Sequence, residues 1–131
     1  MIYQGKAAYQ IAHDTLFSML LIIDDICQRH GIAYQLAAGT LLGAVREGDF
    51  IAWDKDADIA MLRSDFERFM QVAAQELPAH FFFQHQQSDL LFFLQVCKVR
   101  LQNSRRINAT SKVPAQIHQG IALDIFPFDD V

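Results

Sequence analysis

Two aspartates separated by one residue are the first feature of this sequence that could carry chemistry. Asp56 and Asp58 stand in the run 56–61 (DADIAM), where acidic residues alternate with small or apolar ones. This alternation predicts a β-strand whose two carboxylates project from one face, while Ala57 and Ile59 point to the core. Like charges this close repel one another unless a cation neutralises them or water separates them. Mg²⁺ or Mn²⁺ would bind such oxygens and still accept phosphate oxygens, whereas the alternative is a solvated acidic strand.

Gly39 and Thr40 are a second candidate feature, because they directly follow a predicted strand and open a predicted short helix, residues 40–46. Backbone N–H groups at the start of a helix bind phosphate, and glycine lets a ligand approach the main chain closely. Either residue would also serve as the N-cap of this helix, so ordinary capping is the alternative explanation.

A third carboxylate, Asp124, lies inside an otherwise apolar run, residues 120–126 (GIALDIF). Burying this charge is costly unless a metal ion or a hydrogen bond compensates. Asp124 is therefore either a further site carboxylate or a structural aspartate with hydrogen-bond partners.

Three basic residues are candidates to meet a phosphate: Arg46, Lys98 and Arg100. Lys98 and Arg100 fall on one face of an alternating strand, and cations facing a donor would offset charge developing on a leaving nucleotide. Ordinary surface charge is the alternative for all three. The five histidines show no metal-ligand spacing, and we assign none of them a catalytic role.

The elements that must position these residues alternate between helices and strands. Apolar residues recur at three- and four-residue steps from Ala8 to Arg29, which predicts a helix ended by Gly31 in a left-handed conformation. Ser64 and Glu67 match a capping box that would open another helix. We expect helices at residues 8–29, 40–46 and 64–77, strands at 32–36, 56–61, 81–85, 90–101 and 120–126 with Pro127 closing the last, and a loop at 102–119. This order predicts an α/β (α+β) fold with a mixed sheet flanked by helices.

The bulk composition sets limits on the class of protein. With 131 residues, 52% of them hydrophobic and 20% charged, residues 1–131 are expected to form a single globular domain. The net charge of −4 and the scattered basic residues argue against nucleic-acid binding. The most apolar run, Leu16 to Ile23, is too short to span a bilayer, and no secretory signal is recognisable, so a cytoplasmic location is expected. Cys27 and Cys97 lack metal or redox spacing and are expected to be buried free thiols.

Four segments together resemble the LicD family of phosphocholine transferases in order, spacing and residue type. They are HGIAY, AGTLLGAVR, FIAWDKDADI and GIALDIFP, residues 30–34, 38–46, 50–59 and 120–127. That family belongs to the nucleotidyltransferase superfamily and is related to the fukutin-type ribitol-phosphate transferases. The resemblance covers most of the chain from about Leu16 and implies a nucleotidyltransferase-like fold.

The resemblance also implies roles for individual residues. Gly39 and Thr40 match the family's phosphate-positioning turn, and Asp56 and Asp58 match its metal-binding pair. Asp124 matches a third carboxylate on a neighbouring strand, and we expect it to complete the metal site or to accept a proton from the acceptor hydroxyl. Asp54 matches the first acid of the family's Trp-Asp-Asp-Asp run. Lys55 replaces the second acid of that run, which puts a positive charge beside the site.

The activity implied by the resemblance is a Mg²⁺-dependent or Mn²⁺-dependent transfer of phosphocholine, or a similar phospho-substituent. The donor would be CDP-activated and the acceptor a hydroxyl of a cell-surface glycan such as lipopolysaccharide or teichoic acid. One alternative is nucleotidyl transfer to a sugar, small molecule or protein. Another is a non-catalytic nucleotide- or protein-binding domain, because the chain stops at Val131 whereas family members usually continue. The sequence gives no indication of oligomeric state.

Overall fold

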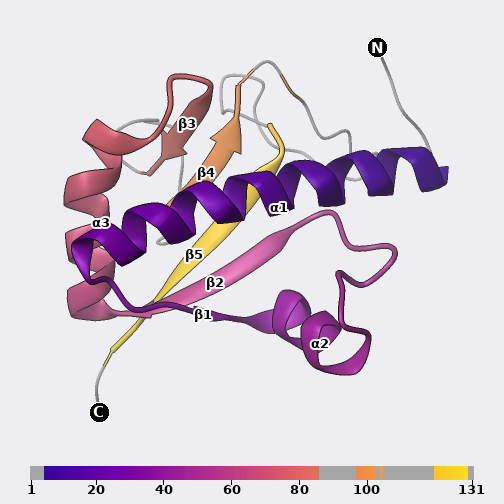
Figure 1. Ribbon diagram of the computed structural model, residues 1–131, viewed down its shortest axis with the longest axis horizontal. Coiled ribbons are helices and arrows are strands. Elements are labelled where there is room, and N and C mark those ends of the chain that lie inside the picture. Colours follow the sequence, from indigo (N-terminus) through magenta and orange to yellow (C-terminus); the bar gives the residue numbers. More distant parts are fainter. Residues whose placement is uncertain (1–4, 86–96, 103, 105–119, 130–131) are drawn as a thin grey trace.

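A mixed β-sheet is the frame of the structure, a computed structural model that describes residues 5–85, 97–102, 104 and 120–129 (Figure 1). Within these residues the sheet has five strands in the order β1-β2-β5-β4-β3. The strands are β1 Gln35–Leu36, β2 Ala57–Leu62, β3 Phe81–Gln84, β4 Cys97–Leu101 and β5 Ala122–Phe128. β2 and β5 run parallel, and the other neighbouring pairs are antiparallel. The expected α/β fold with a mixed sheet is confirmed.

The long helix α1, Gly5–His30, lies across one face of the sheet (Figure 1). It begins three residues before the predicted start and ends as predicted, with Gly31 at a φ of 65°. The N–H of Ile32 donates to the carbonyl of Cys27 (2.8 Å) and that of Gly31 to the carbonyl of Gln28 (3.4 Å). These two hydrogen bonds form a Schellman motif, and glycine adopts the required left-handed conformation without steric cost.

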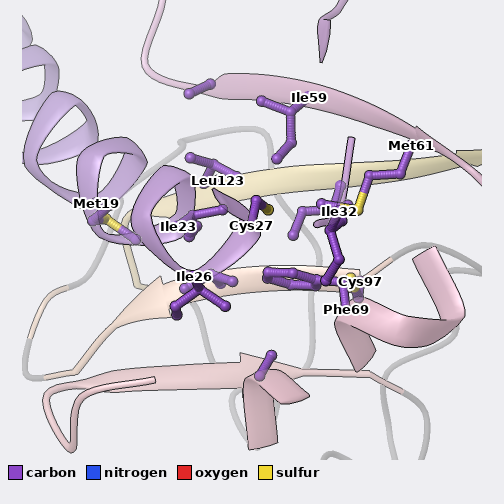
Figure 2. Packing of buried hydrophobic residues seen from close by; sticks show 14 of the residues in the cluster. Met19, Ile23, Ile26, Cys27, Ile32, Ile59, Met61, Phe69, Cys97 and Leu123 are labelled. Carbon is purple, nitrogen blue, oxygen red and sulfur yellow. The ribbon is translucent and has the colours of Figure 1, made fainter. Parts of the chain in front are cut away.

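The hydrophobic core lies between this face of the sheet, α1 and the helix α3, Arg63–Glu76 (Figure 2). α1 contributes residues at helical spacing, and the strands contribute every second residue. The largest fully buried apolar side chains are Leu16, Met19, Ile23, Ile26, Cys27, Ile59, Met61, Phe69, Val99, Leu123 and Ile125. Both cysteines are buried and free, as predicted. Burial, with the nearby charges of Asp24 and Asp65, raises the pKa of the Cys27 thiol to about 12, so this thiol is unreactive at neutral pH.

The start of α3 differs from the prediction. Leu62, the last residue of β2, occupies the N-cap position, and no side-chain capping bond forms there. Ser64 lies inside the first turn, so the predicted capping box with Glu67 is wrong. The reason is that β2 leads into the helix without a connecting residue. The end of α3 agrees with the prediction, because Leu77 follows the last helical residue in an extended conformation.

Several strand limits also differ from the prediction. β1 is shorter than the expected residues 32–36, and β2 begins at Ala57, so Asp56 immediately precedes it. Residues 90–96 of the expected fourth strand, and most of the expected loop at 102–119, lie outside the described residues. Pro127 was predicted to end the last strand, but β5 continues through it. Parallel pairing with β2 carries β5 on to the pair Leu62↔Phe128.

None of the helices in the described part of the chain combines the length with the apolar character that crossing a bilayer requires.

The short helix α2, Ala38–Arg46, is followed by a segment that packs back against it at Gly43. A Cβ atom at Gly43 would lie 2.5 Å from the carbonyl oxygen of Asp49 and 3.0 Å from the backbone nitrogen of Ile51. Gly43→Ala is therefore expected to destabilise the fold by about 1–3 kcal/mol, because both neighbours are backbone atoms. Urea denaturation measures this effect. Val45→Ala, at a 79% exposed position of the same helix, is the control, and equal stability of the two variants would contradict the close contact.

Candidate active site

A row of polar side chains crosses the sheet on the face opposite the helical core. Asp58 in β2 is the register partner of Asp124 in β5, which is in turn the partner of Lys98 in β4. Lys98 is paired with Gln84 in β3. Because successive side chains of a strand point to opposite faces, and Ile59 faces the core, these four residues share the other face. The structure thus brings together Asp58, Asp124 and Lys98, which were predicted separately.

Lys98 and Asp124 form a largely buried ion pair. The ammonium nitrogen of Lys98 lies 2.6 Å from Oδ1 of Asp124, and the two side chains are only 10% and 14% exposed. Lys98 thus neutralises the third carboxylate of the candidate site, as a buried charge requires. Contact of Lys98 with a donor phosphate stays a prediction.

The surroundings of Asp58 make its carboxylate hold a proton more tightly than usual. Its pKa is raised to about 6, first by burial and then by the negative charges of Asp124 and Asp54, while Lys98 acts in the opposite direction. The backbone N–H of Asp58 donates to the hydroxyl oxygen of Thr40 (2.8 Å). The Asp58 carboxylate therefore sits where an additional cation would be favourable.

The start of α2 lies directly against β2 at Asp58. Ala37 occupies the N-cap position and makes no side-chain capping bond, so the predicted capping by Gly39 or Thr40 is wrong. The Thr40 hydroxyl is instead used by Asp58, and the N–H of Ala37 donates to the Asp58 carbonyl (3.0 Å). Ala38 adopts a φ of 47°, a left-handed conformation that costs alanine energy and that the surrounding bonds must hold in place.

Asp54 connects the start of α2 with the Asp-x-Asp pair. Its Oδ2 lies 2.8 Å from the position that a Cβ at Gly39 would occupy, so glycine makes room for this carboxylate. Its Oδ1 accepts the N–H of Asp56 (3.1 Å). Only the family resemblance had drawn attention to Asp54, whose contacts depend on the turn in which its own N–H donates to the carbonyl of Ile51 (2.9 Å).

The carboxylates fit a divalent cation in part. Asp54, Asp56 and Asp58 carry the hard oxygen ligands that Mg²⁺ prefers, and a cation would relieve the repulsion of Asp58 by Asp124 and Asp54. Within the described residues, no three Asp, Glu, His or Cys side chains converge on one point that could hold a metal. Asp124, moreover, is already bound by Lys98. Metal binding by Asp56, Asp58 and Asp124 therefore stays a prediction.

The two arginines predicted to bind substrate lie apart from this cluster or are engaged elsewhere. Arg46 is exposed at the last position of α2, the end opposite Gly39, and bonds to Glu47 (3.3 Å). Arg100 is 7% exposed and donates to Gln84 Oε1 and to the carbonyl of Gly120, both at 2.6 Å. These bonds tie β4 to its neighbours in the sheet. Contact of either arginine with substrate stays a prediction.

Comparison with known proteins identifies a family and several relatives. Residues 31–131 match the family model described as "LicD/FKTN/FKRP, nucleotidyltransferase domain". Over 56 residues the chain is 45% identical to lipopolysaccharide cholinephosphotransferase LicD of Haemophilus influenzae, covering 43% of this chain and 21% of that protein. Over 75 residues it is 29% identical to ribitol 5-phosphate transferase FKRP of Mus musculus, covering 57% and 15%. The human FKRP is 37% identical over 51 residues, covering 39% and 10%. The matched segments thus span less than a quarter of each relative.

Proposed function

The chain belongs to the LicD/FKTN/FKRP nucleotidyltransferase-domain family, and we propose that it carries the site for transfer of a phospho-linked group to a glycan hydroxyl. The more specific proposal is transfer of phosphocholine from CDP-choline to a cell-surface glycan such as lipopolysaccharide, with Mg²⁺ or Mn²⁺ as cofactor. The LicD relative, a lipopolysaccharide cholinephosphotransferase, supports both the transferred group and the acceptor class, and the FKRP relative, a ribitol 5-phosphate transferase, supports transfer of a phospho-linked group. The observation that carries the proposal is the register row Asp58–Asp124–Lys98 beside the start of α2.

Donor phosphate would lie between the start of α2 and the strand β2, which carries Asp58. The first N–H groups of a helix, here those near Gly39, have no carbonyl partner within it and can bind an anion. The Asp54 carboxylate beside Gly39 would repel that anion unless a cation lay between them. Mg²⁺ held by Asp56 and Asp58 would supply that positive charge and polarise the donor phosphate.

Asp124 is the proposed acceptor of the proton released from the glycan hydroxyl. The hydroxyl oxygen attacks the phosphorus of the phosphocholine group, the bond to CMP breaks, and CMP leaves with the electron pair. The Lys98 ammonium, 2.6 Å from Asp124, fixes this carboxylate and balances its charge before the proton arrives. The same contact makes Asp124 a poor candidate for a strong metal ligand.

Titration calorimetry of CDP-choline into the purified protein, with and without Mg²⁺, tests the donor site. We expect binding that requires Mg²⁺ and that is lost in the Asp56→Ala/Asp58→Ala variant, whose circular dichroism spectrum should remain that of the folded protein. Product analysis then identifies the reaction, because CMP release indicates phospho-group transfer and pyrophosphate release indicates nucleotidyl transfer. If CDP-choline, CTP and other CDP-linked donors all fail to bind, the chain is a non-catalytic domain and the proposal is refuted.

A further inference from the structure

The first half of α1 holds the segment that leads into the Asp-x-Asp pair, although α1 lies outside the residues matched by the family model. Nε2 of His13 is 2.5 Å from the carbonyl oxygen of Asp54. The His13 ring stacks on Phe50, with ring centroids 4.8 Å apart and planes inclined by 16°. One turn earlier, the Tyr9 ring lies 5.1 Å from the ammonium nitrogen of Lys55. The helix therefore contacts both ends of residues 50–55.

The contact between His13 and Asp54 has a defined direction. A carbonyl oxygen only accepts hydrogen bonds, so Nε2 of His13 must carry the proton and donate it. Stacking on Phe50 fixes the plane of the imidazole ring, and the N–H bond lies in that plane. The ring contact thus aims the donor at a main-chain atom 41 positions away in the sequence.

Asp54 links the bond from His13 to the candidate site. Its carbonyl is held by His13, while its carboxylate accepts the N–H of Asp56 and packs against Gly39 at the start of α2. A rotation of the Asp54 main chain would move the carboxylate away from both partners. The orientation of Asp56 and the space above Gly39 therefore depend on where the Asp54 backbone is held.

We propose that His13 is a positioning residue, which fixes the Asp54 main chain and thereby sets the acidic residues Asp54 and Asp56 for cation and donor binding. It does not touch the reacting atoms. The proposal rests on the proposed function for its catalytic consequence, but the positioning itself is a property of the free protein. It gives the long N-terminal helix a role in the site beyond covering the core.

Two substitutions separate the hydrogen bond from the ring contact. His13→Phe keeps an aromatic ring on Phe50 and removes the donor, whereas His13→Gln keeps an N–H near the position of Nε2 and removes the ring. The primary measurement is amide hydrogen exchange at Asp56 and Asp58, whose N–H groups are bonded to Asp54 and Thr40. The second is Mn²⁺ binding followed by electron paramagnetic resonance.

For His13→Phe we expect exchange at the Asp56 amide to become about fivefold to tenfold faster and Mn²⁺ affinity to fall by a similar factor, as for the loss of one hydrogen bond. The amide of Ile125 in the core should keep its wild-type rate. His13→Gln should recover most of both losses. Gln10→Ala is the control on the same helix, because its exposed side chain bonds only to Asp14 in the described structure, and it should match the wild type.

Wild-type exchange rates in His13→Phe, or equal acceleration in His13→Phe and His13→Gln, would overturn the proposal, because the N–H donor would then be irrelevant. Failure of the proposed function is recognised separately. If the wild-type protein binds neither Mn²⁺ nor CDP-choline, the transferase assignment fails, while the exchange rates of the two variants still decide whether His13 holds the Asp54 main chain.

Discussion

Replacement of Asp58 by asparagine is expected to lower the rate of phospho-group transfer by about 10²–10³-fold or more and to leave the protein folded. Asparagine preserves the size of the side chain and removes the negative charge that would hold the cation. A radiolabelled or mass-spectrometric assay of CMP release measures the loss. Asp25→Asn, at an exposed position of α1, is a matched control and should retain full activity.

The same substitution is expected to make the free protein more stable at neutral pH. The folded state raises the pKa of Asp58 to about 6, mainly by burial and then by Asp124 and Asp54, so the folded chain binds this proton more tightly than the unfolded chain. The resulting stabilisation is fully present below the ordinary value of about 3.9 and is lost as pH rises through about 6. Asparagine has no proton to lose. The free energy of unfolding of Asp58→Asn should therefore increasingly exceed that of the wild type between pH 4 and 6. The difference should reach on the order of 1–2 kcal/mol after allowance for solvent screening.

Urea denaturation at pH 4, 5, 6 and 7 without divalent cations measures this difference. Adding Mg²⁺ above pH 6 should stabilise the wild type, because a ligand that binds only the folded state favours it, and should leave Asp58→Asn unchanged. If Asp58→Asn transfers phosphocholine at the wild-type rate, Asp58 is not part of the active site. If the stability difference between the wild type and Asp58→Asn stays constant from pH 4 to 7, folding does not raise the pKa of Asp58.

The side of the sheet on which these residues lie could be predicted because β2 and β5 are buried against the helices on one face. Period-two alternation then places Ile59 in the core and Asp58 on the other face, and the same holds for Leu123 and Asp124. The register that makes Asp58 and Asp124 neighbours could not be predicted. It depends on the pairing of two strands far apart in the chain, and no local pattern specifies that pairing.

Helix starts and the roles of polar residues were predicted less well, because tertiary contacts decide them. Thr40 has the side chain of a good N-cap, but the hydroxyl bonds to Asp58 instead. Alternation correctly placed Lys98 and Arg100 on one face, but it cannot tell whether that face is covered, and both side chains are buried. His13 had no recognisable spacing, since its partner is a carbonyl group that any residue could provide.

Lys98→Met is expected to destabilise the fold by about 3–5 kcal/mol, the largest stability effect that we predict here. Methionine has a similar length but no charge, so Asp124 would remain 14% exposed without its cation. Asp58, its register partner on the neighbouring strand, would add repulsion. Urea denaturation at pH 7 measures the loss. Arg63→Met is the control, because the side chains of its ion pair with Asp129 are 45% and 69% exposed and such a pair contributes little to stability.

The double variant Lys98→Met/Asp124→Leu tests whether the loss of stability in Lys98→Met comes from the unpaired charge of Asp124. Removing both charges should recover most of the stability that Lys98→Met loses, because an apolar pair leaves no unpaired charge in the sheet. The double variant should not catalyse transfer, because the proposed proton acceptor is missing. The single variant adds a further test, since Mg²⁺ should restore part of its stability only if Asp124 and Asp58 can share a cation once Lys98 is gone. If Mg²⁺ restores stability, Lys98 occupies the place of a metal ion in this sheet. If Mg²⁺ has no effect, the cation is bound by Asp56 and Asp58 alone, and Asp124 acts as the proton acceptor.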